Sequence, residues 1–218
     1  MKVLVAGSHG KIGRRLVSRL AADGHKAIAM IRDPSQAEEL RVRGGQPLVA
    51  DLAQDVAFAV EGCDAIVYTA GAGAGSGAAK KQTVDRAGAE KLVDAARRHG
   101  VRRYVMVSSI GAHDPGSARG PMRPYLEAKQ QADKYLAASG LDYTIVRPGR
   151  LTDDGGDGRI EASLELGRRG DVPRDDVATT LLAVLSDDRT IGLTFELFDG
   201  ATPIADALDR LVKTAGRP

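Results

Sequence analysis

Short apolar runs alternate with segments of helical periodicity along the chain. The runs Lys2–Ala6 and Lys26–Ile31 are apolar after their first residue, as expected for strands buried on both faces of a parallel sheet. Between these runs, apolar residues recur at the spacing that places them on one face of a helix: Ile12, Leu16, Val17 and Leu20. The start of the chain therefore predicts a strand, a helix and a second strand.

The alternation continues toward the C-terminal end of the chain. Further strands are predicted at residues 47–50, 64–69, 104–108, 143–147 and 193–198, with a short strand-like stretch at 160–164. Further helices are predicted at residues 34–43, 56–60, 82–99, 125–139, 174–185 and 204–212. In the helix at 82–99, the periodicity predicts a core face made by Val84, Ala87, Leu92, Ala95 and Ala96.

This unbroken alternation, without linker or internal repeat, predicts an α/β protein. We expect a single doubly wound Rossmann fold, with one parallel sheet of about seven strands in the order 3-2-1-4-5-6-7 and helices on both faces. Residues 1–218 should form one domain, in which residues 150–218 contribute a small substrate-side region.

The first predicted strand runs into a glycine-rich turn that opens a helix. Gly7 can take the tight turn out of the strand, Gly10 lets the backbone approach a pyrophosphate, and Gly13 lets the helix pack close to the sheet. The helix start offers unpaired N–H groups and a positive dipole end to phosphates. Although the spacing is G-x-x-G-x-x-G rather than G-x-G-x-x-G, its position predicts a dinucleotide site. The expected contacts are Gly7, Ser8, Gly10, Lys11, Ile12 and Gly13.

Arg32 stands at the end of the second predicted strand. An acidic residue at this place would bind the ribose hydroxyls of NAD, whereas an arginine suits the 2′-phosphate of NADP. Asp33 follows and is interpreted as the cap of the next helix, not as a ribose ligand. We therefore expect NADP(H) to be preferred over NAD(H).

Ligands of doubly wound sheets bind outside the carboxyl ends of the strands. Asp51 ends the third predicted strand and could bond the adenine amino group or cap the helix that follows; both interpretations stay open. The glycine after the fourth strand allows close approach of the backbone to a cofactor. Cofactor contacts are predicted here for Asp51, Leu52, Ala70, Gly71 and Ala72.

Tyr125 and Lys129 are four residues apart and share one face of a predicted helix. A nearby ammonium group stabilises a phenolate, so such a tyrosine can exchange a proton with a carbonyl or alcohol oxygen near neutral pH. Ser108 and Ser109 end the fifth predicted strand and could orient the substrate oxygen, or could satisfy loop backbone groups. Tyr125, Lys129 and Ser109 are the predicted catalytic residues, and Lys129 is also expected to bind the cofactor by holding its ribose hydroxyls.

These motifs together resemble the atypical short-chain dehydrogenase/reductases, in the NmrA-like and epimerase/dehydratase-like branch. The resemblance spans essentially the whole chain and rests on motifs in family order: Gly7-x-x-Gly10-x-x-Gly13, Asp51-Leu52, Val107-Ser108-Ser109, Tyr125-x-x-x-Lys129, Tyr143 through Gly149, and Arg174-x-Asp176-Val177-Ala178.

The resemblance implies a bound nicotinamide dinucleotide with the tyrosine–lysine pair at its nicotinamide. It also implies that Pro148, Gly149 and Leu151 lie against the nicotinamide end. Ile110 follows Ser109 where some relatives keep serine or threonine, so the chain departs from the family pattern beside the third catalytic position. Relatives that epimerise nucleotide sugars carry a larger C-terminal region than this chain has after Gly149, which disfavours such substrates.

Composition narrows the partners. A net charge of +2 over 218 residues makes nucleic acid a poor expectation, and no apolar run reaches the length of a membrane span. Cys63 is the single cysteine, so neither a disulfide framework nor a zinc site is expected, and no other metal site is predicted. No signal peptide is recognisable, and we expect a cytoplasmic location. Oligomeric state and substrate identity stay open.

The leading hypothesis is an NADP(H)-dependent oxidoreductase that acts on a small carbonyl or alcohol. A regulatory protein that binds NADP(H) and reports redox state is the non-enzymatic alternative, because NmrA-like relatives behave in this way and often lack the tyrosine. An epimerase or dehydratase with a tightly held cofactor is the enzymatic alternative. The presence of both Tyr125 and Lys129 favours an enzyme.

Overall fold

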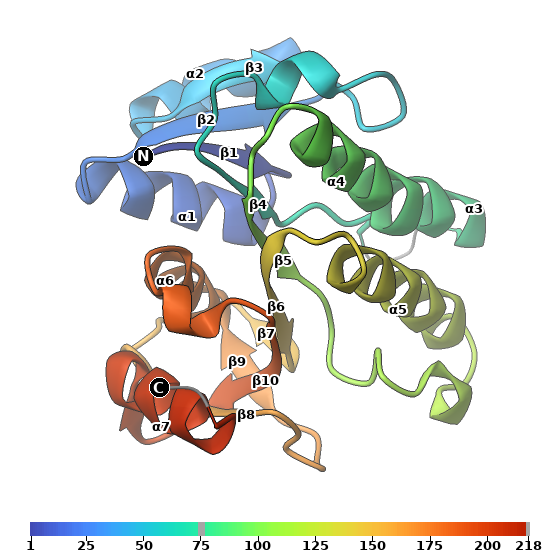
Figure 1. Cartoon of the computed structure of the whole chain (residues 1–218), viewed down its shortest axis with the longest axis vertical. Helices are drawn as coiled ribbons and strands as arrows, with labels where there is room; N and C mark the ends of the chain where they lie inside the picture. Colours follow the sequence, from blue (N-terminus) through green and yellow to red (C-terminus); the bar gives the residue numbers. More distant parts are fainter. Residues whose placement is uncertain (74–76, 217–218) are drawn as a thin grey trace.

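Seven parallel strands with almost wholly apolar centres form the middle of the protein. They are β1 (Lys2–Ala6), β2 (Lys26–Ile31), β3 (Gln46–Val49), β4 (Ala65–Tyr68), β5 (Arg103–Val107), β6 (Asp142–Pro148) and β10 (Leu193–Asp199). Their order in the sheet is β3-β2-β1-β4-β5-β6-β10, which confirms the predicted order with β10 as the seventh strand. Figure 1 shows this arrangement in the computed structural model, which describes residues 1–73 and 77–216.

Two antiparallel strands extend the sheet beyond β10. β8 (Arg159–Ser163) pairs with β10, and β11 (Thr202–Pro203) pairs with β8, so the described residues form nine strands in one sheet rather than about seven. β7 (Arg150–Thr152) and β9 (Asp171–Pro173) form a separate parallel pair. These additions are short, and short strands carry little periodicity in a sequence, which explains why the sequence pattern predicted only a stretch near Ile160.

Helices cover both faces of the sheet. The described helices are α1 (Lys11–Ala22), α2 (Ala37–Val42), α3 (Ala78–Lys81), α4 (Ala89–Arg98), α5 (Met122–Ala137), α6 (Arg174–Leu185) and α7 (Ile204–Thr214). Turns of 3₁₀ type occupy Pro34–Gln36, Ala57–Val60, Pro115–Ser117 and Asp188–Thr190. Among the described residues, none of these helices has both the length and the apolar character that crossing a membrane requires.

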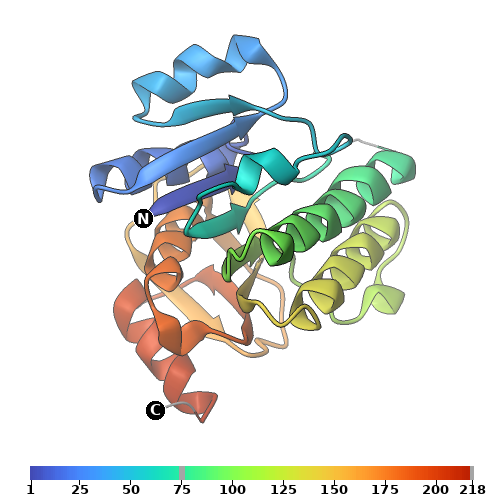
Figure 2. The same cartoon turned by 45° about the horizontal axis from the view of Figure 1, so that its top comes forward.

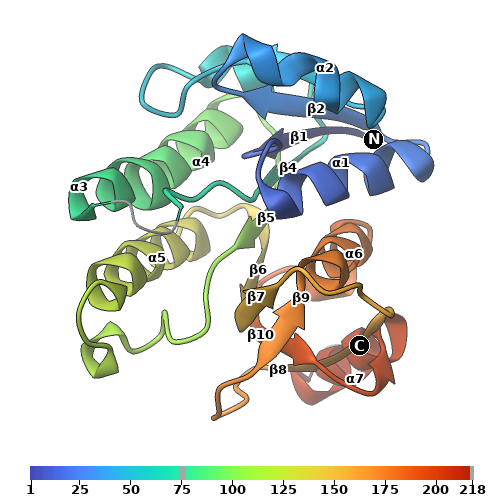
Figure 3. The same ribbon diagram turned by 180° about the vertical axis from the view of Figure 1, so that it is seen from behind.

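Alternate residues of β1 show how the two layers form. Val3 and Val5 pack in a core with α1, α6 and α7, whereas Leu4 and Ala6 pack in a second core with α4 and α5. Figure 2 shows α4 and α5, coloured green to olive, together on one side of the sheet, and Figure 3 shows α6 next to α1 on the other. Both faces of the central strands are therefore buried.

The segment predicted as one helix at 82–99 is divided. Residues Gln82–Gly88 form a π-helical turn that leads into α4. Because a π turn advances by i→i+5 bonds instead of i→i+4 bonds, the buried face rotates. Ala87 is therefore exposed, contrary to the expectation, and Asp85 and Gly88 are buried instead, while Leu92, Ala95 and Ala96 lie in the core as predicted.

Candidate functional site

Close backbone packing shapes the turn between β1 and α1. Gly7 has φ +81°, and a Cβ at this position would lie 2.6 Å from the Cα of Ala70. A Cβ at Gly13 would lie 2.3 Å from the carbonyl oxygen of Gly7. The Gly7 carbonyl also accepts a hydrogen bond of 2.9 Å from the Gly10 N–H. Gly7 and Gly13 are thus required, because a side chain at either position would clash with backbone atoms.

The start of α1 is chemically suited to hold phosphate. Its N-cap residue Gly10 provides no side-chain cap, and no acidic residue occupies its first turn. The first N–H groups of a helix have no partner within the helix, so those of Lys11, Ile12 and Gly13 form a donor set for an anion. The buried Ser8 Oγ donates to the Met30 carbonyl at 2.7 Å, which ties this turn to the end of β2. These features fit the pyrophosphate of a dinucleotide.

Lys11 reaches away from the turn. Its ammonium group pairs with Asp153, which also accepts a hydrogen bond from Arg174 at 2.9 Å. Lys11 and Arg174 together hold the pKa of Asp153 below its usual range. The glycine turn is therefore linked by an exposed ion-pair group to the loop after β7 and to the first residue of α6.

Arg32 follows β2 at the same edge of the sheet and is exposed. Asp33 accepts a hydrogen bond from the Ser35 N–H at 2.9 Å, as expected for the cap of the 3₁₀ turn. Other cations of this edge are engaged, because Glu39 accepts from Arg14 at 2.8 Å and from Arg43 at 3.2 Å. Within residues 1–73 and 77–216, the Arg32 side chain makes no hydrogen bond or salt bridge, although, besides the hydrogen bonds from Ser35, its charge contributes to lowering the pKa of Asp33.

The loops after β3 and β4 continue this edge. The Asp51 carboxylate accepts from the Ala53 N–H at 2.9 Å, so it closes its own turn rather than capping a helix. Leu52 packs against Gly88 of the π turn. Ala70 is buried against Gly7, Gly71 is exposed, and the Ala72 N–H donates to Asp85 at 3.1 Å. The predicted cofactor contacts of these loops stay predictions.

Tyr125 and Lys129 lie on α5, as their spacing predicted, and their side chains approach one another. The Lys129 ammonium is 5.9 Å from the centre of the Tyr125 ring, and that of Lys81 is 5.8 Å from it. Lys129 is only 4% exposed and donates to the Val107 carbonyl at 3.1 Å. Tyr125 is half-buried, so a substrate can reach it.

Asp85 is the residue of the site that the sequence pattern missed. It is 1% exposed, and its carboxylate lies 3.4 Å from the Lys129 ammonium. Burial lowers the pKa of Lys129, but the charges of Tyr125, Asp85 and Asp133 outweigh it, so the pKa is raised. The π turn delivers Asp85 into the interior, and such turns are frequent at functional sites.

Ser108 is engaged inside the protein. Its hydroxyl donates to Asp133 at 2.9 Å, and Asp133 also accepts from Arg147 at 2.8 Å. Burial raises the pKa of Asp133, which the nearby Arg147 and Ser108 offset only in part. Asp133 lies four residues after Lys129 on α5, so helical spacing could have indicated it.

Ser109 is half-buried, and its hydroxyl donates to the adjacent Ile110 carbonyl at 3.2 Å. This contact is local and easily exchanged, so the hydroxyl could turn to a substrate oxygen. Ser109 therefore stays the predicted third catalytic residue.

The chain leaves β6 through a tightly packed segment. Pro148 is buried, and a Cβ at Gly149 would lie 2.2 Å from the Gly170 carbonyl oxygen and 2.7 Å from the Phe198 ring. Leu151 is half-buried in β7, opposite Val172 of β9. The structure places these residues at the sheet edge that also holds the glycine turn, while their contact with nicotinamide stays a prediction.

Comparisons with known proteins agree with this geometry. A family model described as NAD(P)H-binding matches residues 7–188. A Bacillus subtilis (strain 168) protein, named as the uncharacterised sugar epimerase YhfK, is 42% identical over 215 residues, which are 97% of this chain and 100% of that protein.

Solved structures are similar over nearly the whole chain. A putative NAD-dependent epimerase/dehydratase from Bacillus halodurans has a TM-score of 0.94 and 41% identity, covering 97% of this chain and 100% of its own. The oxidoreductase YlbE from Lactococcus lactis has a TM-score of 0.87 and 29% identity, covering 98% and 97%. The chain therefore belongs to the NAD(P)H-binding family, and its resemblance to the atypical short-chain dehydrogenase/reductases is confirmed.

Proposed function

We propose that this protein is an NADP(H)-dependent oxidoreductase that acts on a small carbonyl or alcohol substrate. The observation that carries the proposal is the half-buried Tyr125 beside the buried, protonated Lys129, at the edge of the sheet where the glycine turn fits a pyrophosphate. The family includes proteins named as oxidoreductases, which supports this choice.

Each residue of the site has a distinct task in this proposal. When bound, a nicotinamide cofactor would supply hydride to a carbonyl carbon or accept it from an alcohol. Tyr125 gives its phenolic proton to the carbonyl oxygen during reduction and takes it back during oxidation. The Lys129 ammonium stabilises the phenolate that forms, and the Ser109 hydroxyl donates a hydrogen bond to the same substrate oxygen.

Asp85 and Asp133 are positioning residues in this account. They hold Lys129 in its charged form although it is buried, so that a positive charge faces Tyr125 throughout the cycle. The hydrogen bond from the Ala72 N–H to Asp85 also ties the loop after β4 to this group. A shift of Asp85 would therefore affect both the tyrosine and the predicted cofactor loop.

The preference for NADP(H) is supported by the position and state of Arg32. It follows β2 on the exposed surface, two residues after Met30, whose carbonyl accepts a hydrogen bond from Ser8 of the glycine turn. Glu39 engages the nearby Arg14 and Arg43. A guanidinium group that is free of other partners can give a bidentate contact to a phosphate.

The single cysteine, Cys63, is buried and cannot form a disulfide within the chain, which fits a reducing, cytoplasmic location.

An epimerase or dehydratase is the second candidate, because two similar proteins carry such names. The same Tyr125 and Lys129 would serve it, with the cofactor reduced and reoxidised within one turnover. The distinguishing property is the fate of the cofactor, since only the oxidoreductase consumes NADPH in net terms.

Absorbance measurements of NADPH consumption with a panel of aldehydes, ketones and quinones test the proposal. We expect net oxidation with at least one carbonyl, and slower turnover with NADH at equal concentration. Isomerisation of a sugar substrate without net oxidation would identify the epimerase instead. Tight NADP(H) binding with no turnover across the panel would favour the redox-sensing alternative.

A further inference from the structure

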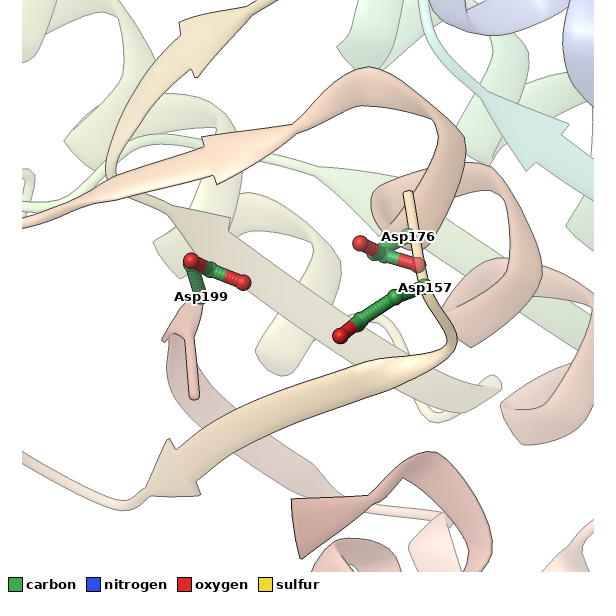
Figure 4. A group of neighbouring side chains, drawn as sticks. All are labelled: Asp157, Asp176 and Asp199. Carbon is green, nitrogen blue, oxygen red and sulfur yellow. The ribbon is translucent and has the colours of Figure 1, made fainter. Parts of the chain in front are cut away.

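Three aspartates converge beyond the outer end of the parallel sheet. Asp157 precedes β8, Asp176 lies in the first turn of α6, and Asp199 is the last residue of β10. One carboxylate oxygen of each lies within 4.8 Å of those of the other two. Figure 4 shows the three side chains arranged around a common space, although they come from three separate elements. None of them is among the predicted catalytic or cofactor-binding residues.

Asp176 is the buried member of this aspartate cluster. It is 1% exposed, and its Oδ1 accepts a hydrogen bond from the Gly158 N–H at 2.9 Å. Its Oδ2 is buried and has no hydrogen-bond partner within residues 1–73 and 77–216. Figure 4 shows one of its oxygens directed into the space that Asp157 and Asp199 also border. A buried carboxylate oxygen without a partner is costly, so this atom points to a missing ligand.

The charges of the aspartate cluster are uncompensated. In the described part of the chain, none of the three aspartates forms a salt bridge, and the guanidinium group of Arg159, two residues after Asp157, donates to the Ala201 carbonyl. Three carboxylates this close repel one another unless a cation lies between them.

We propose that Asp157, Asp176 and Asp199 bind a divalent cation, and that calcium is the favoured ion. A set of oxygen ligands without histidine or cysteine suits a hard cation and disfavours zinc. Calcium accepts irregular arrangements of oxygen ligands and several waters, whereas magnesium requires a near-ideal octahedral shell. The three carboxylate oxygens, all within 4.8 Å of one another, could therefore share one calcium ion without forming an octahedral set. Asp157 and Asp199 are exposed, so water can complete the coordination shell.

The bound ion would fasten three segments of the substrate-side region together. It would link the loop before β8, the end of β10 and the start of α6, which also carries Arg174 and its ion pair with Asp153. This role is structural and does not depend on the proposed oxidoreductase activity.

Calcium titration of the purified full-length protein by isothermal calorimetry, after removal of metals with a chelator, tests the site. We expect saturable binding of one ion per chain, with a Kd on the order of 10⁻⁴ M. Asp199→Asn should weaken this binding about tenfold or more, because it removes a charged ligand from an exposed position that does not support the core. The matched control is Asp154→Asn, which removes one charge from the same polar loop outside the cluster and should bind calcium as the wild type does.

A second variant and a second ion make the outcome decisive. Asp176→Asn keeps an acceptor for the Gly158 N–H and should also lose calcium affinity, provided that circular dichroism shows a folded chain. Calcium should raise the Tm of the wild type but not that of Asp199→Asn. The proposal is overturned if the wild type shows no saturable binding, if Asp199→Asn binds as tightly as Asp154→Asn, or if magnesium binds more tightly than calcium.

Discussion

The two ends of the candidate site are built in different ways. The glycine turn, Gly7–Gly13, is shaped by backbone atoms in close contact and presents N–H groups of α1. The Tyr125–Lys129 pair is instead surrounded by a buried charge network, which we define as Asp85, Lys129, Asp133 and Arg147. The first end depends on the absence of side chains, and the second depends on side chains from several distant segments.

This difference determines how each end responds to change. A backbone site of neutral N–H groups needs no counter-charge within the protein, so it can hold an anion wherever the turn itself is intact. A buried ammonium group needs its carboxylate partners, because an uncompensated charge in the interior is strongly destabilising. We therefore expect substitutions at the charged end to affect both stability and chemistry, and substitutions near the phosphate end to affect mainly cofactor affinity.

The largest expected effect separates chemistry from binding. Tyr125→Phe keeps the ring and removes the hydroxyl, so turnover should fall by roughly 10²–10⁴-fold, the usual contribution of general acid/base catalysis. Cofactor affinity should change little, because the phosphates are held at the other end. Single-turnover oxidation of NADPH and a separate binding titration measure the two quantities. Undiminished turnover in this variant would remove Tyr125 from the mechanism.

The next effect tests the buried charge network through stability. Asp85→Asn retains an acceptor for the Ala72 N–H but leaves Lys129 without its nearest carboxylate, and should lower the free energy of unfolding by about 3–5 kcal/mol. Urea unfolding at neutral pH measures this loss. Adding Lys129→Met to the same variant should restore much of the stability, because the uncompensated charge is then removed.

Glu90→Gln provides the matched control for the charge network. Glu90 lies on α4 in an i,i+4 pair with Arg86 at 3.0 Å near the surface, so its loss should cost only about 0.3–0.5 kcal/mol. If Asp85→Asn and Glu90→Gln lower the free energy of unfolding equally, burial does not make the loss of the Asp85–Lys129 pair more destabilising than the loss of a surface pair.

A smaller effect is expected for Arg32, the residue proposed to bind the 2′-phosphate of NADP(H). Arg32→Ala should weaken NADP(H) binding by about 1.5–3 kcal/mol and leave NAD(H) binding nearly unchanged. Titration of both cofactors against the wild type and the variant measures the difference. Arg41→Ala is the control, since Arg41 is an exposed arginine of α2 that pairs with Glu38. Equal affinity of the wild type for the two cofactors contradicts the assignment of Arg32.

The smallest effect concerns an ion pair that is only partly buried. Asp175 accepts from Arg19 at 2.8 Å, and this contact together with Arg15 lowers its pKa although burial acts in the opposite direction. Because the pKa is lowered in the folded state, the stabilisation is present above the unfolded pKa of about 3.9 and is lost as the pH falls through the folded value. Asp175→Asn should therefore cost on the order of 0.5–1 kcal/mol at pH 7, and nothing once the carboxyl group is protonated. Urea unfolding of the wild type and the variant, at pH 7 and at a pH low enough to protonate Asp175, measures the difference in the free energy of unfolding. A difference that is the same at the two pH values would be evidence against the ion pair as its source.

The elements that carry local signals were predictable from the sequence. The bounds of β2 and α6 agree with the predicted segments 26–31 and 174–185, because apolar runs and helical spacing depend on neighbouring residues. The glycine turn and the helical placement of Tyr125 and Lys129 were predictable for the same reason. By contrast, β7, β9 and β11 have at most three residues each, too few to show a period.

Residues whose roles depend on distant partners could not be predicted. Asp85 is a polar residue within an apparent helix, and only the π turn turns it inward toward a lysine 44 positions later. The aspartate cluster likewise joins Asp157, Asp176 and Asp199 through the folding of three separate segments, and their spacing resembles no metal-binding motif. The choice between Ser108 and Ser109 as the serine that can contact a substrate also depended on Asp133. This residue accepts the hydrogen bond of the Ser108 hydroxyl, although the two residues are 25 positions apart.

The contact between α1 and α6 has a consequence for how the protein is made. Arg19 of α1 bonds to Asp175 and Thr179 of α6, which lie 156 and 160 positions later in the chain. During synthesis, the first helix therefore leaves the ribosome long before the helix that covers its side exists. Until then, the nascent chain carries an incomplete layer over a sheet whose seventh strand, β10, is also still missing. Such late long-range closure slows folding and leaves apolar surface open to chaperones during translation.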